Sequence, residues 1–384
     1  ELPFDYAVLD ESQAIKNPAS KVTKAACLRH AKHRLCMSGT PLQNNTFDIF
    51  AQMNFLNPGM LGSIEFFRQE FAVPIDKFGE QDRKDHLRKL LFPFILRRTK
   101  EQVARDLPDR TEMILWCEMG EEQRRIYDSH RNHYRESLLE RISEEGMGKS
   151  SIYILEGLTK LRQICDSPAL LRDRGAEDGA AAGEFVPDGP AADEGDAAEG
   201  SGVMGTMPGR YPNVSAKLDE LIREITENTG DHKCLVFSQF TSMLHLIREA
   251  LDERGIEYLY LDGGVPAAAR KRSVEEWQDE GSAARVFLIS LKAGGVGLTL
   301  TAADYVYLVD PWWNPAVEQQ AIDRTHRIGQ VKKVFAYRMI CKDSVEEKIL
   351  QLQEKKRSLA AELVADEIGF IKKLTQEDVT YLFS

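Results

Sequence analysis

Two adjacent carboxylates end a short apolar stretch near the start of the 384-residue chain. Asp10 and Glu11 directly follow "YAVL", which is typical of a buried strand. Ligands of open α/β sheets bind outside the carboxyl ends of parallel strands, so this pair can face a nucleotide. Asp10 would then hold Mg²⁺, which prefers hard oxygen ligands, and Glu11 would orient or deprotonate the attacking water. The alternative for an Asp-Glu pair taken alone is a solvated turn.

Two arginines far along the chain can complement such a site. Arg324 and Arg327, within "QQAIDRTHRIGQ", lie one turn apart on a predicted helix, and Gln320 falls on the same face. Guanidinium groups that face a transferring γ-phosphoryl group stabilise its developing charge, an effect of about 10³–10⁵ in rate. The alternative is a pair of surface salt bridges, which contribute little to stability.

Glycine-rich stretches are the other candidates for phosphate contacts. Gly295 and Gly297, within "KAGGVGLTLTAAD", lack side chains, so backbone amides there can approach a phosphate closely. The triplet at 148–150, "GKS", matches the end of a P-loop, but Ser143 stands where the first glycine should be and the preceding residues are helical. We therefore do not assign phosphate binding to this triplet.

The alternation of apolar strands and amphipathic helices predicts an α/β fold. Between residues 213 and 345, five short strands rich in Val, Ile, Leu and Tyr alternate with helices, which indicates a parallel sheet covered on both faces. Upstream there are only two such strands, "YAVLD" and "HRLCMS". The region from about 58 to 172 is mostly helical in pattern.

An acidic stretch divides the chain. Residues 176–202 contain eight acidic side chains and no lysine or arginine, so the rest of the chain carries −3 of the net charge of −11. Such a stretch cannot bury enough apolar surface to offset its ordering entropy, and 173–212 is predicted to be a flexible linker. The nearly neutral remainder is compatible with basic clusters that face nucleic acid. No stretch has the ~20 apolar residues of a membrane span, so we expect no membrane partner.

Several segments together resemble motifs of the Swi/Snf-type ATPases of helicase superfamily two, which are DNA translocases similar to chromatin remodellers. These segments are "LDESQAIKNP", "SGTPLQNN" and "DRTHRIGQ", and "DPWWNP" is similar to the family's signature loop. The resemblance covers nearly the whole chain. "DESQ" departs from the commoner DEAH and DEAQ forms, so the coupling role that the resemblance gives to Gln13 stays open.

The resemblance implies two RecA-like lobes with ATP and Mg²⁺ bound between them. We expect the C-terminal part of the first lobe at 1–57, an all-α insertion at 58–172, the acidic linker at 173–212, the second lobe at 213–345 and a C-terminal brace helix at 346–384. The first lobe is then incomplete, because the part that carries the P-loop lysine is absent from these residues. The chain as given is therefore expected to be inactive.

The resemblance also implies roles for polar residues near strand ends. Gln13, Ser38 and Thr40 would contact the nucleotide, and the two serine-threonine hydroxyls would relay the state of the γ-phosphate between the lobes. The candidate contacts to the backbone of duplex DNA are Ser238, Gln239, Ser290, Lys292, Thr299, Trp312 and Asn314.

Two sets of residues keep alternative interpretations. One of Trp312 and Trp313 is expected to pack against its own lobe instead of contacting DNA. The basic residues of the helical insertion can form a solvated face as readily as they contact phosphates; these are Arg97, Arg98 and Lys100.

As a function, the resemblance implies an ATP-dependent double-stranded-DNA translocase that moves along the backbone without having to separate strands. We expect a monomeric motor that acts on a DNA-bound complex such as a nucleosome, RNA polymerase or repair factor. The expected location is the bacterial cytoplasm at the nucleoid, or the nucleus in a eukaryote. Two alternatives stay open, namely a DNA- or protein-binding fragment without motor activity and a superfamily-two helicase acting on RNA or single strands.

Overall fold

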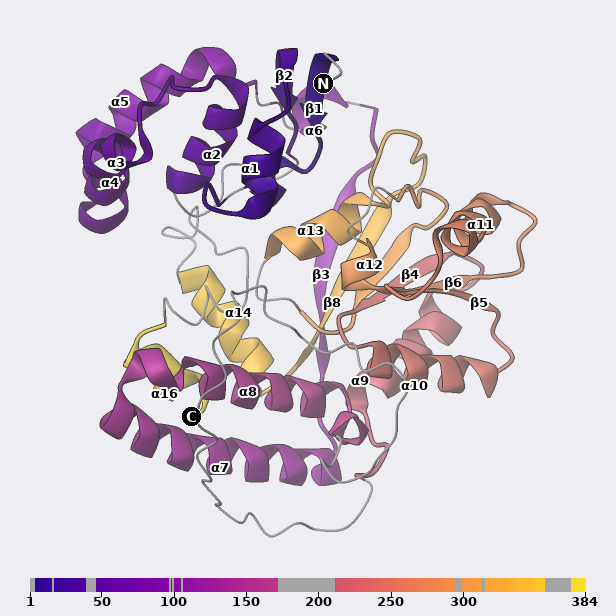
Figure 1. Ribbon diagram of the computed structural model, residues 1–384. Coiled ribbons are helices and arrows are strands. Elements are labelled where there is room, and N and C mark those ends of the chain that lie inside the picture. Colours follow the sequence, from indigo (N-terminus) through magenta and orange to yellow (C-terminus); the bar gives the residue numbers. More distant parts are fainter. Residues whose placement is uncertain are drawn as a thin grey trace.

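A computed structural model places the chain in two bodies, each with a parallel sheet (Figure 1). It describes residues 4–15, 17–38, 46–96, 98, 100–104, 106–171, 211–294, 298–311, 315–355 and 374–384. The parallel pairing of both sheets confirms the predicted α/β class. The predicted linker lies outside the described residues, apart from its last two positions.

The N-terminal body combines a two-stranded sheet with a group of short helices. Its strands are β1 (Phe4–Leu9) and β2 (Ala31–Cys36), which pair in register along their whole length. The helices are a 3₁₀ helix (Ser12–Ile15), α1 (Lys21–Cys27), α2 (Thr46–Leu56), α3 (Ile64–Phe67), a π-helical turn (Arg68–Ala72), α4 (Val73–Phe78), α5 (Gln81–Leu91) and a 3₁₀ turn (Phe92–Phe94). Fully buried Phe67 packs against Phe50 and Phe71, with ring centroids 4.9 and 5.5 Å away, and so joins α2 to α3 and the π-helical turn.

The second body is built on a six-stranded sheet in the order β3–β8–β7–β4–β6–β5. Its strands are β3 (Arg110–Cys117), β4 (Cys234–Ser238), β5 (Tyr258–Leu261), β6 (Val286–Ser290), β7 (Tyr305–Leu308) and β8 (Val334–Cys341). Every residue of β4 and β6 is buried, as expected for central strands of a parallel sheet. Five of the six strands are those predicted between residues 213 and 345.

The sixth strand, β3, comes from the segment predicted to be entirely helical. It pairs with β8 from Arg110 opposite Val334 to Cys117 opposite Cys341. The prediction of an all-α insertion at 58–172 is therefore wrong for this strand. "RTEMILWC" forms an edge strand, and only one of its eight residues is buried. Its apolar run, Met113–Cys117, is short and stands between helical patterns, where periodicity alone does not distinguish a strand from a helix segment.

Helices cover both faces of the second sheet. One layer contains α7 (Glu121–Glu145), α8 (Met147–Asp166), α9 (Ala216–Arg223), α10 (Thr241–Asp252), α14 (Val345–Lys355) and α16 (Gln376–Leu382), with a 3₁₀ turn (Pro168–Leu170) and a π-helical turn (Glu224–Asn228). The other contains α11 (Ala267–Gln278), α12 (Leu291–Gly294) and α13 (Pro315–Asp323). Short α6 (Lys100–Val103) stands between the two bodies in the sequence. Each helix layer forms its own hydrophobic core against one face of the sheet. Alternate residues of β4 belong to different cores, since Val236 faces the first layer whereas Leu235 and Phe237 face the second.

Two further sequence predictions concern these helices. The predicted brace helix at 346–384 corresponds to α14 and the separate α16, with residues 356–373 outside the described chain. The "GKS" triplet lies at the start of α8 and is preceded by the helix α7 instead of the strand that leads into a P-loop, in agreement with its rejection. Within the described residues, no helix has both the length and the apolar character to cross a bilayer.

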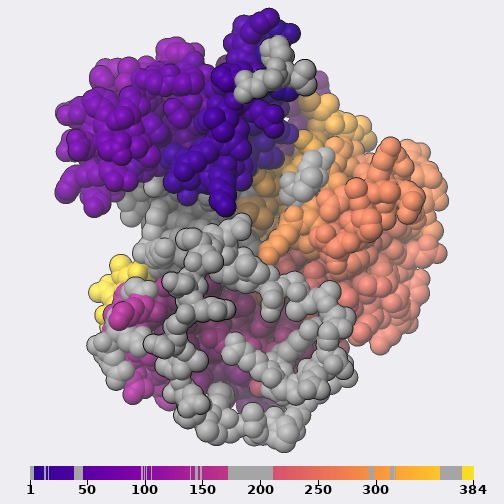
Figure 2. All heavy atoms as spheres, in the orientation of Figure 1, coloured from indigo at the N-terminus to yellow at the C-terminus, as the bar shows by residue number. Residues whose placement is uncertain are grey.

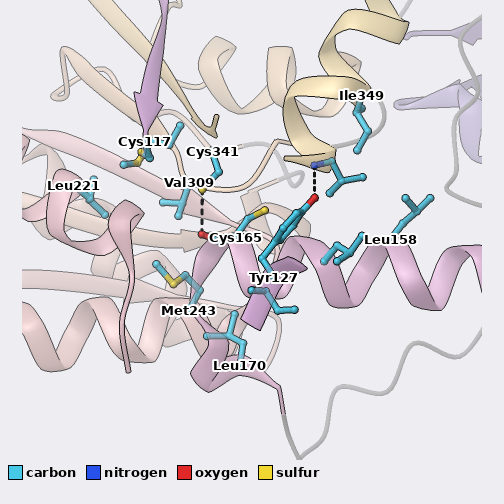
Figure 3. Packing of buried hydrophobic residues seen from close by; sticks show 14 of the residues in the cluster. Cys117, Tyr127, Leu158, Cys165, Leu170, Leu221, Met243, Val309, Cys341 and Ile349 are labelled. Carbon is cyan, nitrogen blue, oxygen red and sulfur yellow. Dashed lines mark hydrogen bonds between the residues drawn. The ribbon is translucent and has the colours of Figure 1, made fainter. Parts of the chain in front are cut away.

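A buried lysine joins segments of the second body that are distant in sequence. Lys217 of α9 is 0% exposed, and its Nζ donates to Asp166 Oδ1 at 2.9 Å, Glu346 Oε1 at 2.6 Å and Val309 O at 2.8 Å. Burial by itself would lower the pKa of Lys217, but the Asp166 and Glu346 carboxylates raise that pKa well above its usual range. Around this cluster, Cys341 Sγ contacts Cys165 O at 3.4 Å (Figure 3).

We expect Lys217→Met to lower the free energy of unfolding by ~3–5 kcal/mol, because it leaves two buried carboxylates without their cation. Urea unfolding followed by circular dichroism measures the change. The control is Lys271→Met in the exposed Lys271–Glu275 pair, which should change stability by less than ~0.5 kcal/mol. Equal stability changes in the two variants would contradict this account of Lys217.

Candidate active site

The predicted carboxylate pair lies in the turn that follows β1. Asp10 Oδ1 accepts from the Glu11 amide at 2.9 Å. The end of β2 holds this turn, since Met37 N donates to Leu9 O at 2.8 Å and Ser12 N donates to Met37 O at 2.9 Å. Glu11 has φ of 50°, in the left-handed region that residues with a Cβ rarely adopt. Backbone strain of this kind is concentrated at functional sites, so the turn is a candidate for chemistry.

The two predicted arginines lie in a turn after α13 and not on a helix, so the prediction of one shared helical face is wrong. α13 ends at Asp323. Beyond it, the Arg327 amide donates to Thr325 O at 3.1 Å, which is a tight turn and not a helical hydrogen bond. At the end of this turn Gln330 is buried, and its Nε2 donates to Ala303 O at 2.8 Å, which holds the turn against the second body. Arg324 is 6% exposed, whereas Arg327 is half-buried.

Electrostatics link the carboxylates of the first body to the arginines of the second. Burial and the positive charge of Arg327 lower the pKa of Arg324, whereas the Glu11 and Asp10 carboxylates act in the opposite direction. The carboxylates therefore lie within Coulombic reach of the guanidinium, although they come from opposite ends of the sequence. Figure 2 shows the indigo N-terminal body adjoining the orange part of the second body. Arg327, Glu11 and Asp10 thus all act on the Arg324 guanidinium.

The other predicted nucleotide contacts are only partly described. Gln320 is half-buried in α13, and Gln13 lies in the 3₁₀ helix that follows the carboxylate turn. Ser38 is exposed just beyond β2, near the same turn. Three more predicted residues lie outside the described chain, namely Thr40, Gly295 and Gly297.

Two of the predicted DNA contacts lie inside the protein. Ser238 is 0% exposed, and its Oγ donates to Phe240 O at 3.2 Å. Ser290 is 5% exposed, and its Oγ accepts from the Ala293 amide at 3.3 Å. Both hydroxyls stabilise the turns that follow β4 and β6. Direct contact of these side chains with DNA, as predicted, is inconsistent with their burial here.

The remaining predicted DNA contacts differ in their exposure. Lys292 and Thr299 are exposed, and Gln239 is half-buried. Trp312 and Asn314 lie outside the described residues, as does Arg97. The exposed residues remain predicted phosphate contacts.

A buried ion pair near these strand ends was not predicted. Arg162 of α8 is 1% exposed, donates from Nη2 to Pro311 O at 2.5 Å and lies 4.0 Å from Asp310 Oδ2. The Gln239 side-chain amide is oriented with its oxygen toward Arg162. This oxygen then accepts from Arg162 Nη1 at 2.7 Å and from Nη2 at 2.6 Å. Asp310 also accepts from the Gln239 amide at 2.9 Å. Burial raises the pKa of Asp310 to about 6, an effect that the Arg162 charge opposes. The pair fixes the start of the "DPWWNP" loop against α8.

A group of potential metal ligands also lies in this core. Cys165, Cys341 and Glu346 are buried and close enough to share an ion. The Glu346 carboxylate already accepts from Lys217 Nζ at 2.6 Å and from the Cys341 amide at 3.1 Å. Burial raises the pKa of the Cys165 thiol well above its usual value, which disfavours the thiolate that a metal would need. We therefore assign a lysine ammonium, not a metal, as the cation of this cluster.

Two family models match most of the chain between them. The model of the SNF2-related domain matches residues 1–170, and the model of the helicase conserved C-terminal domain matches residues 216–329. Among solved structures, the chain is similar to the Sulfolobus solfataricus SWI2/SNF2 ATPase core in complex with dsDNA, with 33% identity and a TM-score of 0.53. That similarity covers 100% of this chain and 73% of the other.

Curated relatives are similar over the same region. The chain is 34% identical to Protein CHROMATIN REMODELING 24 of Arabidopsis thaliana, over 99% of this chain and 36% of that protein. It is 32% identical to the putative ATP-dependent helicase/translocase YwqA of Bacillus subtilis, over 98% of this chain and 37% of that protein. The chain thus spans just over a third of the length of these relatives.

The buried Asp310 predicts a pH dependence of stability. Its folded pKa of about 6 exceeds the ordinary 3.8, so its stabilising contribution is complete below about pH 4 and is lost as the pH rises through about 6. Asp310→Asn cannot ionise at this position. As the pH rises between about 4 and 6, we expect its free energy of unfolding to increase relative to wild type by up to about 1.4 kcal/mol per pH unit.

Urea unfolding of both proteins between pH 4 and pH 7 measures this difference. Glu275→Gln, at an exposed carboxylate, serves as the control and should show no such trend. A constant difference between Asp310→Asn and wild type across the range would show that the carboxyl does not titrate there.

Proposed function

The chain belongs to the Swi/Snf family of superfamily-two ATPases, and from this premise we propose that the protein is an ATP-dependent translocase on double-stranded DNA. The convergence of Asp10 and Glu11 with Arg324 and Arg327 carries the proposal. Two comparisons support it. The similar Sulfolobus solfataricus core was solved in complex with dsDNA, and the Bacillus subtilis relative bears the name of a putative helicase/translocase.

In this proposal, ATP binds between the bodies with its phosphates facing both sets of charges. Glu11 orients or deprotonates the attacking water, and Arg324 and Arg327 stabilise the charge that spreads over the γ-phosphoryl group. Gln320, on the helix that precedes the arginines, helps to position them. The exposed Asp10 carboxylate supplies the kind of hard oxygen that Mg²⁺ prefers, and the ion, when bound, neutralises phosphate charge.

The division of the site between two bodies connects hydrolysis with movement. The bound triphosphate lies beside Glu11 of the N-terminal body and attracts Arg324 and Arg327 of the second body. It therefore favours the arrangement in which the two bodies are close. Loss of the γ-phosphate weakens that preference, so the nucleotide state biases a hinge motion. Lys292 and Thr299 are the exposed candidates for holding the DNA backbone, and contacts to phosphates carry no sequence information.

The substrate complex belongs to the proposal as well. The Arabidopsis thaliana relative is named for chromatin remodelling. We propose that the motor acts on a protein complex bound to DNA, with duplex DNA as the track. Strand separation is not required, because contact with one backbone is enough for stepwise movement.

We expect the full-length protein to hydrolyse ATP faster with duplex DNA than with single-stranded DNA or RNA. Glu11→Gln should lower turnover by about 10²–10⁴-fold, because the amide cannot act as the base. A coupled ATPase assay with each nucleic acid measures both effects. Asp5→Asn is the matched control on the same strand; its exposed carboxylate pairs only with Lys32 among the described residues, and turnover should be unchanged.

Stimulation by RNA or single strands alone would favour the other superfamily-two function. Duplex binding without hydrolysis by wild type would indicate a binding protein without motor activity. Full turnover in Glu11→Gln would exclude Glu11 as the base.

We expect Arg327→Ala to lower ATP turnover by about 10³–10⁵-fold while leaving ATP binding largely intact. The guanidinium acts on charge that develops only in the transition state, so its loss should affect turnover far more than affinity. Calorimetric titration of ATP and steady-state kinetics measure the two quantities. Because Arg327 Nη1 also contacts Leu298 O at 3.3 Å, parallel loss of binding and turnover would assign the residue a structural role. Arg285→Ala, in a surface pair with Asp231, is the control.

A further inference from the structure

We propose that Lys100 is a positioning residue for the arginine turn, defined here as residues 323–327. Lys100 begins α6, between the two bodies. Its Nζ donates to His326 O at 2.8 Å and pairs with Asp323 Oδ1 at 2.7 Å. These partners stand on either side of Arg324 in the sequence, so one ammonium contacts both ends of the turn that presents the guanidinium. The inference rests on the proposed function and adds a residue from outside the site to it.

Residues that follow Lys100 contact the same turn. His326 Nε2 lies 2.8 Å from Pro108 O, and Arg110 Nη1 pairs with Asp323 Oδ1 at 3.3 Å. Asp323 therefore accepts from two cations, one on α6 and one at the start of β3. Since β3 is an edge strand of the second sheet, this stretch of chain is anchored there and supports the arginine turn.

The same network continues along α13. Arg110 Nη2 pairs with Glu112 Oε1 at 2.8 Å, and Glu112 Oε2 pairs with Arg338 Nη2, also at 2.8 Å. Arg338 Nε then pairs at 2.7 Å with the buried Glu318 near the start of α13. Alternating charges from α6, β3 and β8 thus fix both ends of the helix that leads into the arginine turn.

The effect of this contact should appear in catalysis more than in stability. The Lys100 and Asp323 side chains are 43% and 34% exposed, and pairs of that kind contribute little to folding free energy. Catalysis is far more sensitive to position, because a displacement of ~1 Å can cost about 100-fold in rate. Lys100 also lies shortly after the last helical turn of the N-terminal body, so movement of that body would reach the arginine turn through it.

From the sequence alone, Lys100 is either a solvated residue or a phosphate contact. The two hydrogen-bonded partners in the second body favour positioning over both. A phosphate contact would instead require the ammonium to leave Asp323. The three roles predict different kinetic changes.

The test compares Lys100→Met, Lys100→Arg and Lys342→Met in the full-length protein. Lys342 is a matched control, because its pair with Glu118 lies at the opposite ends of β3 and β8 and its side chain is 46% exposed. We expect Lys100→Met to lower the DNA-stimulated kcat roughly 10- to 100-fold, with KM for ATP and duplex affinity within about twofold of wild type. Lys100→Arg should restore most of the rate, and Lys342→Met should match wild type.

Hydrogen–deuterium exchange of a peptide spanning 322–330 gives a readout without turnover. Faster exchange confined to this peptide in Lys100→Met supports positioning. If kcat and exchange are both unchanged in Lys100→Met, the proposal is overturned. Weakened duplex binding at unchanged kcat also overturns it, because Lys100 would then be a DNA contact. Faster exchange throughout the second body would show a general structural role and also overturn it. If wild type shows no ATPase activity, the proposed function fails, whereas the exchange result still tests the positioning contact.

Discussion

A lysine ammonium shielded from water needs an acceptor for each of its protons, and Lys217 obtains all three within the second body. A buried charge is tolerated only when it is paired and hydrogen-bonded, so α8, α9, α14 and the end of β7 must lie together. Two of the acceptors, Asp166 and Val309, are close in sequence to Arg162 and Asp310. The lysine cluster therefore also determines where the second buried ion pair forms and how the "DPWWNP" loop begins.

The candidate active site follows a different electrostatic principle. Burial and the nearby positive charge of Arg327 both lower the pKa of Arg324. Glu11 and Asp10 of the other body, together with Asp323 of the same body, offset only part of that cost. A bound anion would relieve the rest, so the site favours negatively charged ligands. The preference arises from the two bodies jointly, since neither contains both sets of charges.

The sequence was informative where local pattern and tertiary environment agree. The strands β4 to β8, including the edge strand β5, were predicted because each is a short apolar run that alternates with amphipathic helices. β3 was missed because its apolar run, Met113–Cys117, stands alone between helical patterns and does not alternate with helices as the later strands do. The residues Asp10 and Arg324 were found through motifs, but Lys217 was not, because a lysine on an amphipathic helix is normally solvated. The predicted DNA contact Ser238 shows the converse, since a position at a strand end does not indicate whether the side chain reaches the surface.

The arrangement of β3 has a consequence for the integrity of the chain. This strand and helices α7 and α8 precede residue 172, whereas the other five strands follow residue 210, yet all share one sheet and one core. A peptide bond broken anywhere between would leave two polypeptides held by the β3–β8 ladder and by the contact of Asp166 with Lys217. Neither piece could bury its share of the second body's core alone. The second body is thus organised as a split protein, whose halves are suited to fragment complementation from separately produced chains.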